Sequence, residues 1–202
     1  MTVKEQPLRL LAASWRVLAG FTILGSVLGL ALSLLQPLQY ASTVRVLITQ
    51  PGAVGLDAFT IQKSNERIAQ NLSQLLLTST FFENILAQAQ GFNTEYFPAD
   101  EYERRRLWQE SVAIALESGS GLMQVTVYHG NADQAKALVL AATNELAKQA
   151  PNYFGSAVRV QVIDAPLNSR WYAKPNFLNN AFYGAAVGFM LGIIWIITRK
   201  HE

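Results

Sequence analysis

Two uncharged apolar runs at opposite ends of the chain constrain its architecture more than any other feature. The first covers residues 17–35 and the second covers residues 181–197. A helix needs about 20 apolar residues to cross roughly 30 Å of hydrocarbon, and Phe177 and Leu178 extend the second run to that length. We therefore expect transmembrane helices at 17–35 and 177–197, with one domain between them.

Each run has an alternative interpretation. Ala31 and Ser33 have the small-x-small spacing of a signal-peptide cleavage site, although the first run is longer than the usual apolar region of about 7–15 residues. The second run could be a buried core helix, although Arg199 and Lys200 follow it directly. Basic residues at the end of an uncharged run are typical of a span that stops at the cytoplasm.

Flanking charge predicts the orientation of the two spans. Three basic residues precede the first run and two follow the second, whereas the segment between them has nearly equal numbers of acids and bases. The positive-inside rule then places residues 1–16 and 198–202 in the cytoplasm and residues 36–176 outside. Because only about five residues follow the second span, we expect the protein to act in the membrane and outside it.

Both apolar runs contain glycines four residues apart. These are Gly25 and Gly29 in the first run, and Gly184, Gly188 and Gly192 in the second. Small residues at this spacing let helix backbones approach closely in lipid. The pattern predicts packing between spans, within a protomer or between protomers; the alternative is chance, since glycine is common in membrane helices.

The central segment alternates between strand and helix patterns. A compact α+β domain is predicted, with a last strand that forms a parallel pair with the hairpin through a βαβ crossover, hence a small mixed sheet with packed helices. The elements are a strand at 40–49, a loop at 53–62, helices at 64–89 capped by Ser64 and broken near 77–80, a helix from about 98 to 109, a hairpin at 111–117 and 122–129, a helix from 131 to 149 stopped by Pro151, and a strand at 157–164.

Composition and motifs argue against several functions. The absence of cysteine excludes disulfides and thiolate metal sites, and a net charge of +2 does not suggest nucleic-acid binding. Metal, nucleotide and hydrolase motifs are missing from the sequence. His129 ends a predicted strand beside Gly130, where a solvated turn residue is the expected role. We therefore expect a protein that is not an enzyme and needs no cofactor or metal.

Two basic clusters are candidate contact surfaces. Arg104, Arg105 and Arg106 lie on a predicted helix with acidic neighbours, so a solvated face with local ion pairs competes with a contact to another protomer or to an anionic glycan. Arg170, Trp171 and Lys174 lie just before the second span. Anchoring at the lipid headgroups is the simpler interpretation of this second cluster, and stacking on a glycan is the alternative.

Three stretches resemble one known family. Residues 37–48 (PLQYASTVRVLI), 122–144 (LMQVTVYHGNADQAKALVLAATN) and 160–175 (VQVIDAPLNSRWYAKP) are similar to the bacterial chain-length determinants, the Wzz-type polysaccharide co-polymerases, in their short form. Members usually have several regularly spaced prolines in the linker to the second span. Here Pro166 and Pro175 remain, and the residues between them depart from that pattern.

The resemblance implies a bacterial inner-membrane protein with a periplasmic or extracellular domain. It implies a ring-like homo-oligomer that organises a polysaccharide polymerase or exporter and contacts the growing glycan, as in lipopolysaccharide or exopolysaccharide synthesis. Two other functions fit the same layout: a structural or adaptor subunit of a secretion or adhesion complex, and an enzyme of envelope metabolism.

Overall fold

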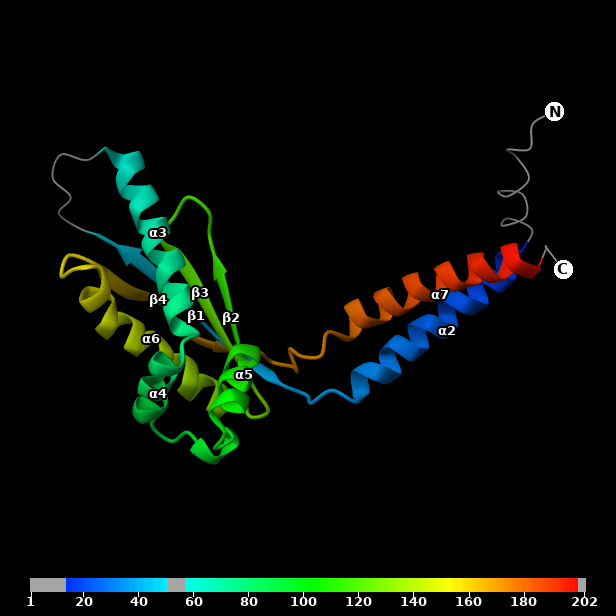
Figure 1. The fold of residues 1–202 in the computed structure, drawn as a ribbon, viewed down its shortest axis with the longest axis horizontal. Helices are drawn as coiled ribbons and strands as arrows, with labels where there is room; N and C mark the ends of the chain where they lie inside the picture. The colour runs from blue at the N-terminus through cyan, green and yellow to red at the C-terminus, as the bar shows by residue number, and fades with distance from the viewer. Residues whose placement is uncertain (1–13, 51–56, 200–202) are drawn as a thin grey trace. The chain divides into compact units, whose positions relative to one another are not determined.

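The computed structural model describes residues 14–50 and 57–199. The chain divides into a helix pair (Met1–Leu38 with Lys174–Glu202) and a domain (Gln39–Ala173). The described part is an α+β fold with a four-stranded sheet and six α-helices (Figure 1). The predicted α+β domain between two long apolar helices is therefore confirmed.

The sheet has the order β2-β3-β1-β4, and every neighbouring pair is antiparallel. The predicted hairpin is confirmed, because β2 and β3 pair from Val112 opposite Val127 to Leu116 opposite Met123. The prediction of a mixed sheet is wrong. The strands are β1 Tyr40–Thr49, β2 Val112–Leu116, β3 Leu122–His129 and β4 Arg159–Asn168.

The error lies in the position of β1. Strands β3 and β4 do run in the same direction, but β1 lies between them and is antiparallel to both. Strand β3 lies between β1 and β2 in the same way. Two interleaved split βαβ units of this kind give the ferredoxin-like arrangement. Sequence alternation identifies strands but not their neighbours, so the crossover looked like a direct pair.

The helices of the domain begin at polar caps. Asp57 accepts a hydrogen bond from the Thr60 backbone at 3.0 Å, and the bonds from Thr60 hold the pKa of this carboxyl below its ordinary value. The predicted loop at 53–62 is therefore wrong from residue 58 onward, and its residues 53–56 lie outside the described part. Ser64 does not cap, because it lies inside the helix. The helices are α3 Ala58–Leu76, α4 Ser79–Gln88, α5 Glu101–Ser111 and α6 Ala132–Phe154, with a 3₁₀ turn at Thr94–Tyr96.

Pro151 does not stop α6, which continues to Phe154. Proline lacks only its own N–H, so near a helix end it removes one hydrogen bond while its carbonyl still accepts. The Pro151 carbonyl accepts from Gly155 at 3.0 Å, and Gly155 ends the helix with a φ of 94°. Strand β4 also extends to Asn168, beyond the predicted end at residue 164.

The core lies between one face of the sheet and the helices. In β1 the alternate residues Val44, Val46 and Ile48 are fully buried. Trp108 of α5 stacks on Phe82 with ring centres 4.8 Å apart, and its indole N–H donates to the Leu76 carbonyl at 2.9 Å. On the opposite face of the two central strands, Arg45 is exposed and Thr43 and Gln124 are half-buried, whereas Ala41 and Thr126 are buried.

One carboxylate lies inside this core. Glu145 of α6 is fully buried and accepts hydrogen bonds from the side-chain amides of Gln88 on α4 and Gln149, the latter at 2.9 Å. Lys148 Nζ lies 4.0 Å from the same carboxylate. These bonds join α4 to α6 and satisfy a group that would otherwise be costly to bury.

Candidate functional site

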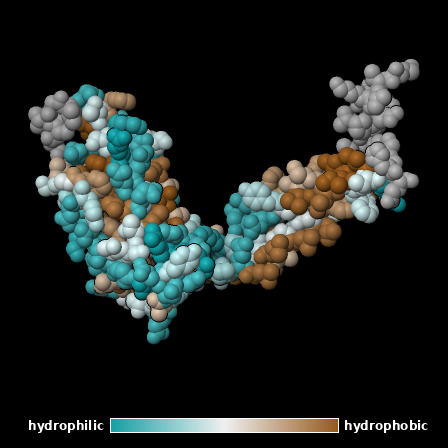
Figure 2. All heavy atoms as spheres, in the orientation of Figure 1, coloured by the Kyte–Doolittle hydropathy of each residue, from teal (hydrophilic) through white to brown (hydrophobic). Residues whose placement is uncertain are grey.

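The helix pair consists of α2 (Trp15–Leu34) and α7 (Phe177–Arg199), and both helices are long and apolar enough to cross a membrane. Only 11% of each apolar window is buried. This argues against a soluble core helix, whose window would be mostly covered. Figure 2 shows the hydrophobic side chains gathered along the two helices.

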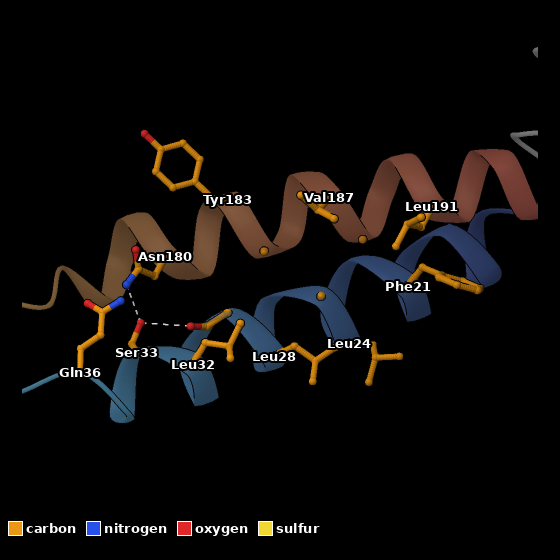
Figure 3. A pocket seen from close by; sticks show the side chains of 14 residues that line it. Phe21, Leu24, Leu28, Leu32, Ser33, Gln36, Asn180, Tyr183, Val187 and Leu191 are labelled. Carbon is orange, nitrogen blue, oxygen red and sulfur yellow. Dashed lines mark hydrogen bonds between the residues drawn. The ribbon is translucent and has the colours of Figure 1, made fainter.

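The structure brings the glycines of the two helices together at their contact (Figure 3). A Cβ added to Gly25 would collide with the Gly184 carbonyl oxygen and lie 2.9 Å from the Gly188 Cα. A Cβ on Gly29 would collide with the Asn180 carbonyl oxygen. The backbones therefore approach too closely for any larger residue, as small-residue motifs permit in lipid.

The other two glycines of α7 differ in what surrounds them: Gly188 faces backbone atoms of α2 and Gly192 faces side chains. A Cβ at Gly188 would collide with the Phe21 carbonyl oxygen. At Gly192 it would meet side chains instead, at 3.1 Å from Phe21 Cβ and 3.3 Å from Leu18 Cδ2. Gly20 of α2 has nothing within 4 Å of the same position. The space is thus too small for a side chain at Gly188, tight at Gly192 and open at Gly20.

A polar contact lies at one end of the helix pair. Asn180 Nδ2 donates to Ser33 Oγ at 2.6 Å, and Ser33 in turn donates to the Gly29 carbonyl at 3.0 Å (Figure 3). Ser33 is only 1% exposed. Sequence reasoning missed this pair, since it extended the second run to Phe177 past the polar Asn180 and considered Ser33 only as part of a cleavage motif. The available signal was a polar residue in or next to each run, four residues from a packing glycine.

A groove of ≈ 490 Å³ runs beside this contact. Its floor is formed partly by the packed glycines, because they leave no side chains there. Leucines of α2 form one side, and Tyr183, Val187 and Leu191 of α7 form the other, with Gln36 and Asn180 at the polar end (Figure 3).

The arginines of α5 separate into paired and free groups. Arg104 bonds Glu83 at 2.8 Å, and Arg106 bonds Glu103 at 2.6 Å. Within the described residues, Arg105 is exposed and makes no ion pair. Of the three predicted contact residues, Arg105 alone keeps its charge unpaired.

The second basic cluster precedes α7. Trp171 is 82% exposed, and Arg170 is exposed beside it. Pro166 lies within β4, while a cis peptide bond joins Lys174 to Pro175. These predicted residues therefore do not form a single site: Pro166 belongs to the sheet and the others to the segment after it.

His129 is buried, so the prediction of a solvated turn residue is wrong. Its Nδ1 accepts from the Asn131 backbone at 3.0 Å, and its Nε2 is buried without a partner. The rings of Phe92 and Tyr96 pack against it, and this burial holds the pKa of His129 below its ordinary value. Across residues 14–50 and 57–199, no three histidine or acidic side chains lie close enough together to hold a metal ion.

No protein-family model matches the chain, and no curated protein matches it either.

Proposed function

We propose that this chain is a non-enzymatic membrane scaffold that regulates the chain length or export of a bacterial polysaccharide. The observation that carries the proposal is the glycine-mediated contact between α2 and α7, two helices long and apolar enough to span. It joins the two ends of the chain into one packed unit with an α+β domain inserted between them.

In this proposal both ends of the chain lie in the cytoplasm and the domain lies outside the inner membrane. The protein forms a homo-oligomer and acts on a polymerase or exporter through its spans and its domain. The balance of charge in residues 36–176 and the sequence resemblance support this assignment. The role needs positioned surfaces and no reacting groups.

Deletion of the gene in its host tests the proposal. We expect the length distribution of a surface polysaccharide to change on a gel, and wild-type protein to restore it. Gly184→Ile should fail to restore it, because the side chain separates the helices, whereas Gly20→Ile should succeed in open space. An unchanged glycan in the deletion strain, with a purified protein that is monomeric, rejects the proposal. Co-purification of secretion or adhesion proteins without glycan enzymes would instead favour an adaptor role.

A further inference from the structure

The face of the sheet opposite the helices carries polar side chains on its central strands. Thr43 and Arg45 of β1 alternate with the fully buried Val44 and Val46. On β3, Gln124 lies opposite Arg45 and Thr126 opposite Thr43. The two threonine hydroxyls bond each other at 2.9 Å. This polar face runs across β1 and β3, the two central strands of the sheet.

Strand β4 is irregular where it reaches this face. The pairing passes from Thr43 opposite Leu167 to Arg45 opposite Asp164, and then to Val46 opposite Val162. From Thr43 to Arg45 the chain advances two residues on β1 but three on β4, and from Arg45 to Val46 it advances one residue on β1 but two on β4. Strand β4 therefore has one extra residue on each side of Asp164. β-Bulges of this kind redirect side chains and are frequent beside functional sites.

The bulges decide which residue faces Arg45. Leu47 lies opposite Gln161, and a regular ladder continued from there would place Ile163 opposite Arg45. The extra residue places Asp164 there instead. Aspartate is disfavoured in strands, so its presence here is not explained by strand propensity.

Two cavities meet at this position. One of ≈ 620 Å³ and one of ≈ 670 Å³ share Arg45, Gln124 and Asp164 in their walls. The first continues along β1 and β4 toward Leu167, which is 75% exposed, and the second continues toward Leu116 of β2. Together they form a groove across all four strands, which suits an extended ligand better than a compact one.

The three shared side chains retain hydrogen-bonding capacity. Arg45 Nε donates to Gln124 Oε1 at 3.4 Å, and Arg45 Nη1 lies 3.9 Å from Asp164 Oδ2. Both contacts are long, and the charged side chains are 62% and 59% exposed. A guanidinium has five donors, a carboxylate only accepts, and an amide does both. A sugar hydroxyl, which donates and accepts, can bond Arg45 and Asp164 at the same time.

We propose that this groove binds a neutral, hydroxyl-rich stretch of polysaccharide, with Arg45, Gln124 and Asp164 as the contact residues. The inference deepens the proposed function and rests on it. The groove is lined by one cation, Arg45, and two carboxylates, Asp164 and Glu117, so it does not favour a polyanion. Peptide strands add to sheet edges through backbone bonds rather than to a polar face.

An array of bacterial surface polysaccharides, neutral and acidic, tests the groove with the full-length protein in nanodiscs. We expect binding to neutral polymers, weakened about tenfold or more by Asp164→Asn and by Gln124→Ala, since each removes a bond to a charged or amide group. Arg105→Ala and Trp171→Ala are controls, because both residues are exposed candidate contacts outside the groove. Both variants should bind the polymers as the wild type does. Unchanged melting temperatures establish that the groove variants fold.

Three results would overturn the inference: no polysaccharide bound, binding unaffected by both groove variants, or binding confined to acidic polymers and abolished by salt. The gene deletion reports on the proposed function separately. If the deletion changes the glycan length but the array shows no binding, the scaffold role stands and binding in the groove is rejected. An unchanged glycan length with neutral polymers bound through Asp164 supports the groove and rejects length control.

Discussion

Asn180 of α7 donates a 2.6 Å hydrogen bond to the buried hydroxyl of Ser33 on α2. The bond lies one turn from Gly29, whose carbonyl accepts from the same hydroxyl. Polar bonds between helices in lipid fix which faces meet, while glycine packing fixes how closely they approach. The two devices together define a single arrangement of this helix pair.

Asn180→Ala should weaken the helix pair. Interhelical bonds of this type contribute about 0.6–2 kcal/mol, so we expect a measurable drop in the unfolding free energy of the protein in bicelles. Asn179→Ala, at the exposed neighbouring position, is the control and should have little effect. Equal effects of the two substitutions would show that the bond to Ser33 does not stabilise the pair.

Gly25→Ala should loosen the contact even though alanine is the better helix former. The added Cβ would collide with the Gly184 carbonyl, and we expect a loss of about 1–3 kcal/mol from overpacking. Gly20→Ala should be neutral or stabilising by up to about 1 kcal/mol, because the site is open. Disulfide trapping between single cysteines placed in α2 and α7 gives a second readout, since the natural chain has no cysteine. Identical trapping in both variants would contradict the close contact.

Glu145→Ala should destabilise the domain. The substitution removes a fully buried carboxylate and the bonds that it accepts from Gln88 and Gln149, whose amides can turn to water, and the loss should be about 1–3 kcal/mol. Thermal unfolding followed by tryptophan fluorescence measures it. Glu117→Ala removes an exposed carboxylate and should leave the midpoint nearly unchanged. A midpoint for Glu145→Ala close to that of the control would mean that the buried bonds contribute nothing net.

The domain should lose stability as the pH falls. The pKa of His129 is lowered in the folded protein, so the unfolded chain binds the proton more readily, near its ordinary value of about 6.5. The stability from the neutral ring is therefore present above about pH 6.5 and is lost as the pH falls toward the folded-state pKa. Melting temperatures between about pH 7.5 and 5.5 test this.

His129→Phe is the matched variant for this titration. Phenylalanine preserves the ring packing on Phe92 and Tyr96 but cannot take up a proton. We expect a lower melting temperature at neutral pH, because the bond from Asn131 is lost, and a smaller fall in acid. A variant with the same acid sensitivity as the wild type would assign the effect to other groups.

The sequence predicted what depends on local pattern and composition. Uncharged apolar runs identified α2 and α7, and alternation identified the strands, because burial of one face imposes these periods. The cap at Asp57 was missed, since residues 53–62 have no periodicity to mark a helix start. The bond between Ser33 and Asn180 joins residues far apart in the chain, and only the folded helix pair brings them together.

Strand order escaped prediction for a related reason. Nothing local distinguishes a strand that pairs with β3 directly from one that pairs across β1. The bulges around Asp164 were equally invisible, because an extra residue shows only against the partner strand. The three arginines of α5 looked alike in sequence. In the described part of the chain Glu83 pairs with Arg104 and Glu103 pairs with Arg106, whereas Arg105 makes no ion pair.

The contact between the first and last strands of the domain has a mechanical consequence. Ser42 lies opposite Asn168, and the pairing continues beyond the sheet through Ser169 to Ala41 at 2.7 Å and Ala173 to Gln39 at 2.7 Å. Backbone hydrogen bonds thus join the two chain segments that lead to α2 and α7 as far as Gln39 and Ala173, the first and last residues of the domain. A force that pulls Gln39 and Ala173 apart must break these hydrogen bonds one after another. Tension between α2 and α7 therefore acts first on the pairing of β1 with β4.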